Sequence, residues 1–396
     1  MEIITSLEAL VLATSQGSGV EHIALPQLGR IVIHYRHTAI EFAKTLASAL
    51  ERGTFPNLKV VNLYRNAIGD EGAKALATAL KRGSFPALEF IDLSWNEIGP
   101  VGAEALASVL EHGSLPQLER VNLGGNVLGS DGVKAIAAAL ERRPSPTLER
   151  IELHGNGIGY EGVKAFATAL ERGSLPRFKH IELSNNVMGE DGAKVLATAL
   201  KHGTFQALEG IYVDSNEIGD NGTKALASAL RRGEFPQLRC IDLYDSHIGD
   251  EGAKAIALTL EHGSFRELEC VDISDNNIRL DGVSALASVL EHGSLARLKR
   301  FNICLNYFGE KGAELLAGTL QRVALPLLED VDVFDDRIPN DIELRVRLAA
   351  SGARQRGRIL LLLSAESSRC DAPARRFLAR DGDHALACRT LRFMLP

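Results

Sequence analysis

Hydrophobic and polar positions alternate along this chain in a pattern that returns every 30 residues. In each repeat an apolar residue opens the phrase, and the fourth and sixth positions are apolar between polar neighbours, as in Leu58, Val61 and Leu63. This alternation is typical of a half-buried β-strand. A degenerate copy opens at Leu28, and further copies open at Leu58, Leu88, Leu118, Leu148, Phe178, Leu208, Leu238, Leu268, Leu298 and Leu328. A fixed period of this length predicts a solenoid of about eleven stacked repeats.

The second half of each repeat changes to helical spacing. In the segment 72–83, the residues Leu76, Ala79 and Leu80 fall on one face of a helix. Between strand and helix, the ninth position of most repeats is asparagine, at Asn66, Asn96, Asn126, Asn156, Asn186, Asn216, Asn276 and Asn306. We expect this side chain to satisfy backbone groups of its own turn and of the neighbouring repeat.

The phrase L-x-x-[IV]-x-[LIV]-x-x-N-x-[ILV]-G, followed by a helix rich in Ala and Leu, resembles leucine-rich repeats of the ribonuclease-inhibitor type. Nucleotide-binding immune receptors and Ran GTPase-activating proteins have repeat domains of this type. The resemblance covers roughly residues 28 to 340. It implies an α/β horseshoe with a parallel β-sheet on the concave face and α-helices on the convex face. It does not specify a function, because many activities share this fold.

Three recurrent features of the helices have local explanations. Gly69 and its equivalents are predicted to supply a turn with positive φ before the helix. At the helix end a basic residue precedes glycine, as in Arg82-Gly83, where the cation favours the last carbonyls and the glycine suits the position after the helix. Acidic residues at the helix start are expected to pair with lysines four residues later. These acids are Asp70, Glu190, Asp220 and Asp250, and the lysines are Lys74, Lys194, Lys224 and Lys254.

Three segments are predicted along the chain. Residues 1–27 form a partial repeat that caps the N-terminal end, with a helix beginning at Ser6. Residues 28–351 form the repeat domain, which ends in a capping helix at 340–350. Residues 352–396 contain nine arginines, no lysine and four acidic residues, and we expect them to be a disordered basic tail. Because the rest of the chain is acidic, this tail is a candidate to fold back on the acidic concave face and to compete with a basic partner.

Composition and charge narrow the class of protein. The net charge of −7 does not indicate a nucleic-acid-binding protein, and the longest apolar run is too short to span a membrane. The start of the chain has no basic segment of a secretory signal. The cysteines are odd in number, at Cys240, Cys270, Cys304, Cys370 and Cys388, and do not form a disulfide framework. We therefore expect a cytoplasmic protein, with the nucleus as the alternative compartment.

The sequence contains no signature of catalysis or of cofactor binding. Neither a phosphate-binding loop, nor a dinucleotide fingerprint, nor an H-E-x-x-H motif is present, so we expect no cofactor, no metal and no enzyme activity. Histidines recur at the helix ends, where we interpret them as capping groups rather than metal ligands; they are His112, His202, His262 and His292. Cys240 and Cys270 share a strand position in adjacent repeats, and their parallel side chains favour free thiols over a disulfide.

The concave strand face is the candidate binding surface. Its third, fifth, seventh and eighth positions carry an acidic stripe that is densest in the C-terminal half, with aromatic residues interspersed and arginines mostly in the N-terminal half. The predicted partner-binding residues are Tyr64, Asp92, Trp95, Glu152, Glu182, Tyr212, Asp214, Asp242, Tyr244, Asp245, Asp272 and Asp275. Trp95 and Tyr244 are the expected anchors, because aromatic side chains dominate interface energies. The competing interpretation is that these polar residues only keep the face soluble.

Three functions remain open at this point. The leading one is a non-catalytic interaction scaffold that binds a protein with a basic patch and binds neither nucleic acid nor membrane. The second, implied by the resemblance, is a GTPase-activating protein in which Arg36 or Arg65 acts on the GTPase site. The third is a stand-alone or fragmentary sensor module related to the immune receptors.

Overall fold

The computed structural model describes residues 2–4, 23–24, 28–32, 39–263, 265–291, 295–323, 325, 327–333, 338, 342 and 346. The chain divides into two units, Met1–Ala350 and Ser351–Pro396, and every described residue belongs to the first. The helix predicted from Ser6, almost all of the capping helix predicted at 340–350 and the tail predicted at 352–396 lie outside the described residues.

The described part alternates strands and helices, and its main sheet has twelve strands in the order β1-β3-β5-β6-β7-β8-β9-β10-β11-β12-β13-β14. The strands are β1 (Glu2–Ile4), β3 (Leu28–Val32), β5 (Val60–Asn62), β6 (Phe90–Asp92), β7 (Arg120–Asn122), β8 (Arg150–Glu152), β9 (His180–Glu182), β10 (Gly210–Tyr212), β11 (Cys240–Asp242), β12 (Cys270–Asp272), β13 (Arg300–Asn302) and β14 (Asp330–Asp332). A second small sheet pairs β2 (Ile23–Ala24) with β4 (Gly53–Thr54).

One helix follows each strand of the main sheet from β3 to β13. The helices are α2 (Ala39–Arg52), α3 (Gly69–Arg82), α4 (Pro100–His112), α5 (Gly129–Arg142), α6 (Tyr160–Glu171), α7 (Gly189–His202), α8 (Gly219–Arg232), α9 (Asp250–His262), α10 (Leu280–Glu291) and α11 (Gly309–Arg322). No helix in the described ranges is both long enough and apolar enough to cross a membrane.

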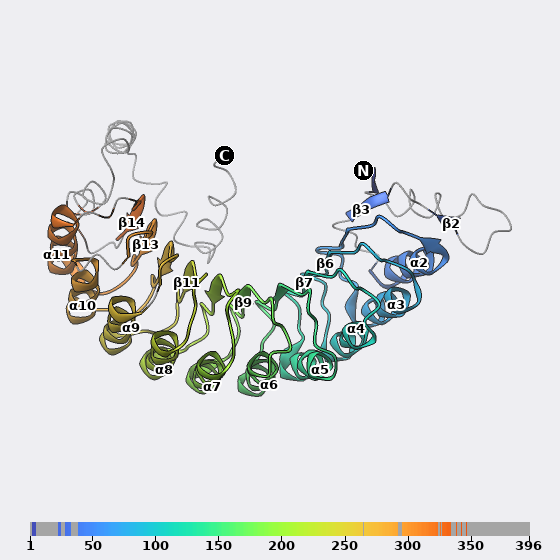
Figure 1. Cartoon of the computed structure of the whole chain (residues 1–396), viewed down its shortest axis with the longest axis horizontal. Coiled ribbons are helices and arrows are strands. Elements are labelled where there is room, and N and C mark those ends of the chain that lie inside the picture. The colour runs from blue at the N-terminus through green and yellow to red at the C-terminus, as the bar shows by residue number, and fades with distance from the viewer. Residues whose placement is uncertain are drawn as a thin grey trace. The chain divides into compact units, whose positions relative to one another are not determined.

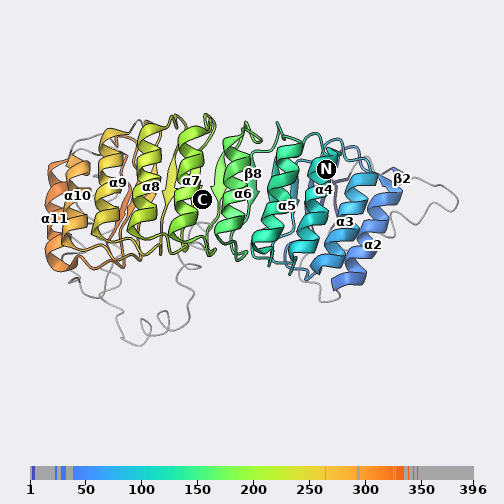
Figure 2. The ribbon, with the colours of Figure 1, turned by 90° about the horizontal axis from the view of Figure 1, so that it is seen from below.

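All strand pairs of the main sheet are parallel, and from β3 onward residues 30 apart in sequence lie opposite each other, as Ile211 and Ile241 do. The strands line the concave side of the first unit, and the helices cover its convex side (Figure 1). The helices lie side by side in sequence order (Figure 2). The predicted α/β solenoid, with an open parallel sheet, is therefore confirmed. The sequence did not predict β1, which adds a strand at the N-terminal edge of the sheet.

The core is one continuous apolar layer between sheet and helices. The opening residue and the fourth and sixth positions are buried in every complete repeat, as Leu88, Ile91 and Leu93 show. From the helix, Ala73 and Leu76 pack against this layer. Each repeat buries its apolar face only against its neighbours, so the stability of the array comes from the interfaces between repeats.

The recurrent asparagine at the ninth position forms a buried ladder between repeats, as predicted. Asn96 donates its side-chain amide to the carbonyls of Leu63 (2.8 Å) and Ser94 (3.1 Å). Its Oδ1 accepts the backbone N–H of Asn66 at 2.8 Å. The repeat that opens at Leu238 has Ser246 instead, whose hydroxyl donates to the carbonyl of Tyr244 at 3.1 Å.

The prediction for the helix starts was only partly correct. Gly69 has φ +55°, and Gly129, Gly189, Gly219 and Gly309 are also left-handed. By contrast, Gly99, Gly159 and Gly249 have extended backbones, with φ of −96°, −91° and −98°. In the latter repeats the helix begins one residue later.

The predicted pairing of Asp70, Asp220 and Asp250 with lysines four residues later was wrong. Oδ1 of Asp70 accepts the backbone N–H groups of Gly99 (2.7 Å) and Gly102 (2.8 Å), which lie at the N-terminal end of the next helix. Asp220 does the same for Gly249 and Gly252, and Asp250 for Arg279 and Gly282. Glu190, with its longer side chain, does form the predicted pair with Lys194, at 2.6 Å.

The glycines after the helices also differ from the prediction. Among the described glycines that follow a helix, only Gly113 and Gly173 adopt the left-handed conformation that such a position favours, with φ of +70° and +74°. Gly83 has φ −74° and ψ 171°. A Cβ at Gly83 would lie 2.5 Å from the ring of Phe85, so glycine is needed here to admit the ring. Gly53, Gly203, Gly233 and Gly263 have the same relationship to Phe55, Phe205, Phe235 and Phe265.

Candidate functional site

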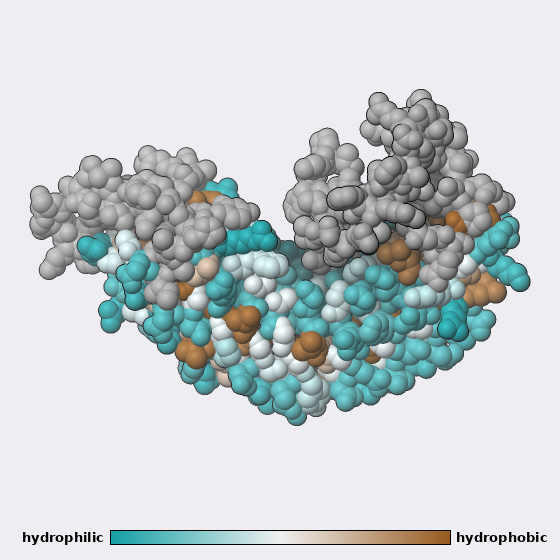
Figure 3. Space-filling view, turned by 180° about the vertical axis from the view of Figure 1, so that it is seen from behind, coloured by the Kyte–Doolittle hydropathy of each residue, from teal (hydrophilic) through white to brown (hydrophobic). Residues whose placement is uncertain are grey.

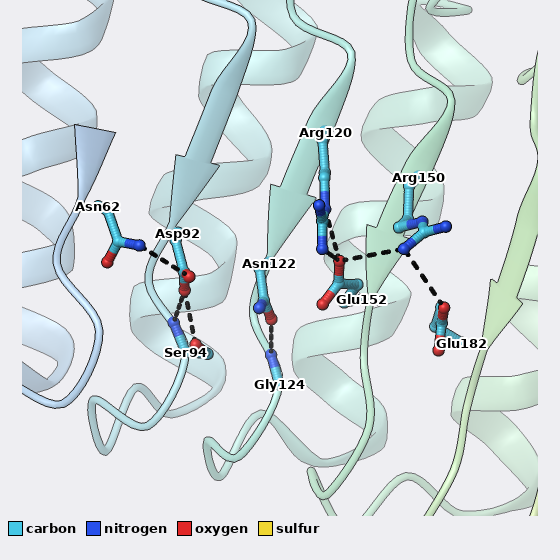
Figure 4. A network of polar contacts seen from close by, with 9 residues as sticks. All are labelled: Asn62, Asp92, Ser94, Arg120, Asn122, Gly124, Arg150, Glu152 and Glu182. Carbon is cyan, nitrogen blue, oxygen red and sulfur yellow. Dashed lines mark hydrogen bonds and ion pairs between the residues drawn. The ribbon is translucent and has the colours of Figure 1, made fainter. Parts of the chain in front are cut away.

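Most fifth-position residues of the concave face have a structural role. Oδ1 of Asp92 accepts the backbone N–H of Ser94 at 3.0 Å and the Ser94 hydroxyl at 2.6 Å (Figure 4). Asp242 and Asp272 accept the N–H of the residue two positions later in the same way. A short carboxylate or amide at this position closes the turn that follows the strand. Asp92 and Asp242 are accordingly almost fully buried.

The three central repeats depart from this rule, because their fifth positions are Glu152, Glu182 and Tyr212. Oε1 of Glu152 accepts the Nε–H of Arg120 at 2.6 Å and also lies against Nη2 of that arginine. Nη1 of Arg150 lies 3.9 Å from both Glu152 and Glu182 (Figure 4). These four side chains form a charge network across β7, β8 and β9, in which both predicted acids are ion-paired.

His180 and Tyr212 form a stacked pair next to this network, with ring centroids 6.0 Å apart. The pKa of His180 is lowered to about 3, mainly by burial and further by the charges of Arg150 and Lys179. The imidazole is therefore neutral at pH 7. Its buried Nδ1 has no hydrogen-bond partner among the described residues. A Cβ at Gly210 would lie 2.4 Å from the Tyr212 ring, so the glycine makes room for the stack.

Cys240 and Cys270 lie opposite each other in the register of β11 and β12. Neither is disulfide-bonded, as predicted, and the same holds for Cys304. A hydrogen bond with Cys270, together with burial, raises the pKa of the Cys240 thiol. The Cys240 thiol is therefore protonated at neutral pH rather than activated as a nucleophile.

The C-terminal half of the concave face collects carboxylates around Tyr244. The Tyr244 hydroxyl donates to Oδ2 of Asp275 at 3.1 Å. Burial is the main cause that raises the pKa of Asp245, and the charge of Asp275 raises it further. Asp214 accepts a hydrogen bond from the Ser184 hydroxyl. The Asp275 carboxylate is thus held close enough to oppose the ionisation of Asp245.

An aromatic cluster lies at the opposite end of the face. The guanidinium carbon of Arg65 is 5.2 Å from the ring centroid of Trp95 and 5.4 Å from that of Tyr64. Trp95 is 48% exposed, and its indole occupies the space that a Cβ on Gly125 would take. Arg65 of the preceding repeat and Gly125 of the following one therefore fix the indole with part of it open to solvent.

Several predicted binding residues occupy a strained backbone position. The eighth position of these repeats has positive φ, with values of 57° at Trp95, 46° at Asp245 and 52° at Asp275. Glycine takes the same position without strain at Gly125 and Gly155. Side chains kept where glycine would be easier are candidates for function.

The structure thus separates the predicted residues into groups. Tyr64 and Trp95 lie together at one end, Tyr244, Asp245 and Asp275 lie together at the other, and Glu152 and Glu182 are ion-paired between them. The Arg120–Glu152 pair was not predicted from the sequence. Its signal was the recurrence of Arg at the third position and of Glu at the fifth position of the next repeat.

Comparison with known families identifies the repeats. Six segments match the family described as Leucine Rich repeat, at residues 56–77, 87–107, 115–137, 145–167, 236–257 and 267–287. The chain is a leucine-rich repeat protein. No curated protein matches it.

Solved structures resemble this leucine-rich repeat protein at low identity. A chain from the yeast Rad7 and Elc1 complex has a TM-score of 0.46 and 13% identity, covering 80% of this chain and 78% of that one. An internalin, InlF of Listeria monocytogenes, has a TM-score of 0.41 and 13% identity, covering 82% and 78%. The actin-binding site 2 of leiomodin-1 has a TM-score of 0.28 and 19% identity, covering 37% and 76%.

The interior of the leucine-rich repeat array offers little space for a ligand. Two apolar cavities of about 30 and 20 Å³ lie between sheet and helices, each no larger than a few water-sized spheres. Within the described ranges, no three His, Cys, Asp or Glu side chains are placed to hold a metal ion. His112, His202 and His262 lie in the last turns of α4, α7 and α9.

Proposed function

We propose that this protein is a non-catalytic interaction scaffold of the ribonuclease-inhibitor-like type. Its concave face binds a partner protein by contacting a basic patch on that partner. The observation that carries the proposal is the charge of the concave positions from β9 to β13. They contain six carboxylates and one arginine, and hence a charge of −5; the acids are Glu182, Asp214, Asp242, Asp245, Asp272 and Asp275.

Two features favour a partner over mere solubility. The carboxylates of Asp245 and Asp275 lie so close that the charge of Asp275 helps to raise the pKa of Asp245, an arrangement that solubility alone does not require. A cation from a partner would relieve the repulsion between these carboxylates. Tyr244 donates a hydrogen bond to Asp275 and offers an aromatic surface to the aliphatic part of a lysine or arginine. The acidic surface also speeds the approach of a basic partner at low ionic strength.

We place this activity in the cytoplasm. Cys240 and Cys270 lie directly opposite each other without forming a disulfide, which is the state that a reducing compartment maintains.

The experiment measures binding of a fluorescent lysine octapeptide by anisotropy at low salt. The double variant Asp245→Asn/Asp275→Asn is compared with Asp131→Asn, whose acid pairs with Lys134 on helix α5. We expect the double variant to bind at least about ten-fold more weakly, which corresponds to about 1.4 kcal/mol. The control should bind like wild type. Equal affinity of the double variant and wild type would show that the acidic half of the concave face is not the binding surface.

A search for the natural partner uses the same surface. Affinity purification with wild type and with Trp95→Ala/Tyr244→Ala, followed by mass spectrometry, should recover a basic protein with wild type only. Recovery of the same proteins by both would place the interaction elsewhere on the molecule.

A further inference from the structure

The two halves of the concave face carry opposite charge. In the described repeats from β3 to β8, the third, fifth, seventh and eighth positions contain four arginines and two carboxylates, a charge of +2; the arginines are Arg30, Arg65, Arg120 and Arg150. From β9 to β13 the same positions have a charge of −5. A partner that only carried a basic patch would leave the N-terminal half unmatched.

Aromatic rings hold two of these arginines in place. The guanidinium carbon of Arg120 lies 4.7 Å from the ring centroid of Phe90. Arg65 lies near the rings of both Tyr64 and Trp95. Cation–π contact and stacking restrict a guanidinium without using its N–H donors, so less conformational entropy is lost when it binds a carboxylate.

The glutamates of the central network are buried more deeply than their arginines. The side chain of Arg120 is 42% exposed and that of Glu152 only 10%, and Arg150 is 26% exposed against 18% for Glu182. A guanidinium has five N–H donors, and Glu152 takes only those on one side of Arg120. The accessible groups of this network are therefore positive, although its sum of charges is zero.

We propose that a second surface of the concave face binds an acidic polypeptide segment of the same partner whose basic patch contacts the C-terminal half. This arginine–aromatic surface consists of Tyr64, Arg65, Phe90, Trp95, Arg120 and Arg150. This inference rests on the proposed function and adds a second contact of opposite sign. The two contacts give the partner one orientation along the arc, because a reversed partner would face like charges at both ends.

The spacing of the two contacts constrains the partner. Neighbouring parallel strands lie about 4.8 Å apart, so four strand steps, roughly 19 Å, separate β7, which carries Arg120, from β11, which leads into Tyr244 and Asp245. An extended chain covers this span in about six residues. An acidic block, about six further residues and a basic block would therefore occupy both halves at once.

Nucleic acid fits this surface less well than a polypeptide does. Four arginines are few for a polyanion, and the neighbouring half of the face is acidic along the path that the strand would follow. A polypeptide changes its sign of charge within a few residues, whereas a nucleic-acid backbone does not.

The test uses four labelled probes in anisotropy titrations at low salt. They are a glutamate octapeptide, a lysine octapeptide, a two-block peptide of four Glu, six Gly/Ser and four Lys, and a twenty-nucleotide oligothymidine. The variants Arg65→Gln and Arg120→Gln are compared with Arg142→Gln, a matched change on α5 where the arginine pairs with Glu111. Circular dichroism and thermal unfolding check that each variant retains its fold.

We expect Arg65→Gln and Arg120→Gln each to weaken the glutamate peptide at least about five-fold and to leave the lysine peptide unchanged. Asp245→Asn/Asp275→Asn should have the opposite selectivity, both sets should weaken the two-block peptide, and Arg142→Gln should change nothing. Binding of the lysine peptide without binding of the glutamate peptide would overturn this inference and leave the proposed function standing. Failure of the lysine and two-block peptides would remove both. Another outcome is that oligothymidine binds more tightly than the glutamate peptide and loses this binding in Arg65→Gln and Arg120→Gln. That result would overturn the inference and identify nucleic acid as the ligand of the arginine–aromatic surface.

Discussion

Asp250 accepts a hydrogen bond from the backbone N–H of Arg279, 29 residues later, with Oδ1 and N 2.8 Å apart. The residue equivalent to Arg279 is glycine in the repeats that open from Leu58 to Leu238 and at Leu298. Asp70, Asp220 and Ser130 make the same bond to Gly99, Gly249 and Gly159. Wherever a short acceptor occupies the thirteenth position of one repeat, the twelfth position of the next is not left-handed. Each repeat therefore determines the backbone conformation at the start of the next helix. Because Asp250 accepts the backbone N–H of Arg279, that position is not left-handed and can carry a side chain.

The first prediction concerns this cap between repeats. Asp220→Ala should lower the free energy of unfolding by about 1 kcal/mol, the usual value of a helix cap. Asp220→Asn should cost less, because an amide oxygen can still accept both N–H bonds. Glu190→Ala is the control, since Glu190 pairs with the exposed Lys194 instead. Urea unfolding followed by circular dichroism measures the differences, and equal losses for Asp220→Ala and Glu190→Ala would contradict the capping role.

The second prediction completes the asparagine ladder. Ser246 stands where neighbouring repeats have Asn216 and Asn276, and each of those donates to a carbonyl of the preceding repeat. Ser246→Asn should raise the free energy of unfolding by about 1 kcal/mol, the net value of a typical buried hydrogen bond. The reverse change, Asn276→Ser, should lower it. A loss of stability in Ser246→Asn would mean that the surrounding backbone has adapted to serine.

The third prediction concerns acid sensitivity. In the unfolded chain His180 binds a proton near its ordinary pKa of 6.5, whereas in the folded chain its pKa is about 3. Between these values the unfolded state holds more protons, so the contribution of His180 to stability is present above pH 6.5 and is lost as pH falls towards 3. His180→Asn should therefore unfold less readily with falling pH than wild type. His262→Asn, at the exposed end of α9, should follow the wild-type profile.

The fourth prediction is a trade of stability against binding. The pKa of Asp245 is raised, so the folded protein favours its protonated form, and stability falls as pH rises from the ordinary value of 3.8 through the raised value. Asp245→Asn should therefore be more stable than wild type at pH 7, with the difference vanishing near pH 3. The same variant should bind the lysine octapeptide more weakly. Urea midpoints at both pH values and one titration test this, and a less stable variant at pH 7 would refute the charge-crowding argument.

The fifth prediction concerns residues 352–396, which contain nine arginines and four acids. If this segment competes for the acidic half of the concave face, its deletion should strengthen binding of the lysine octapeptide at low salt. The gain should shrink with added salt, because the Debye length falls from about 10 Å at 0.1 M to 3 Å at 1 M. Equal affinity of the truncated and full chains at low salt would exclude this competition.

The sequence by itself determined the architecture. A period of 30 residues, strand alternation and then helical spacing leave one arrangement, in which every repeat repeats the same contacts. The buried asparagine at the ninth position was predictable for the same reason, since one polar group that recurs in an apolar phrase must find partners in every repeat. The charge difference between the two halves of the concave face was also visible in the order of residues.

Only the tertiary structure decided which acids are available to a partner. Asp92 and Glu152 read alike in the sequence, but one closes its own turn and the other lies under Arg120 from a neighbouring repeat. The tertiary structure likewise decided that Asp70 caps the following helix rather than pairing with Lys74. For Glu152 and Asp70 the deciding partner is about 30 residues away, in the repeat stacked beside their own. Local patterns predict what a segment does alone, whereas the choice among several nearby donors depends on distances that exist only after the repeats have stacked.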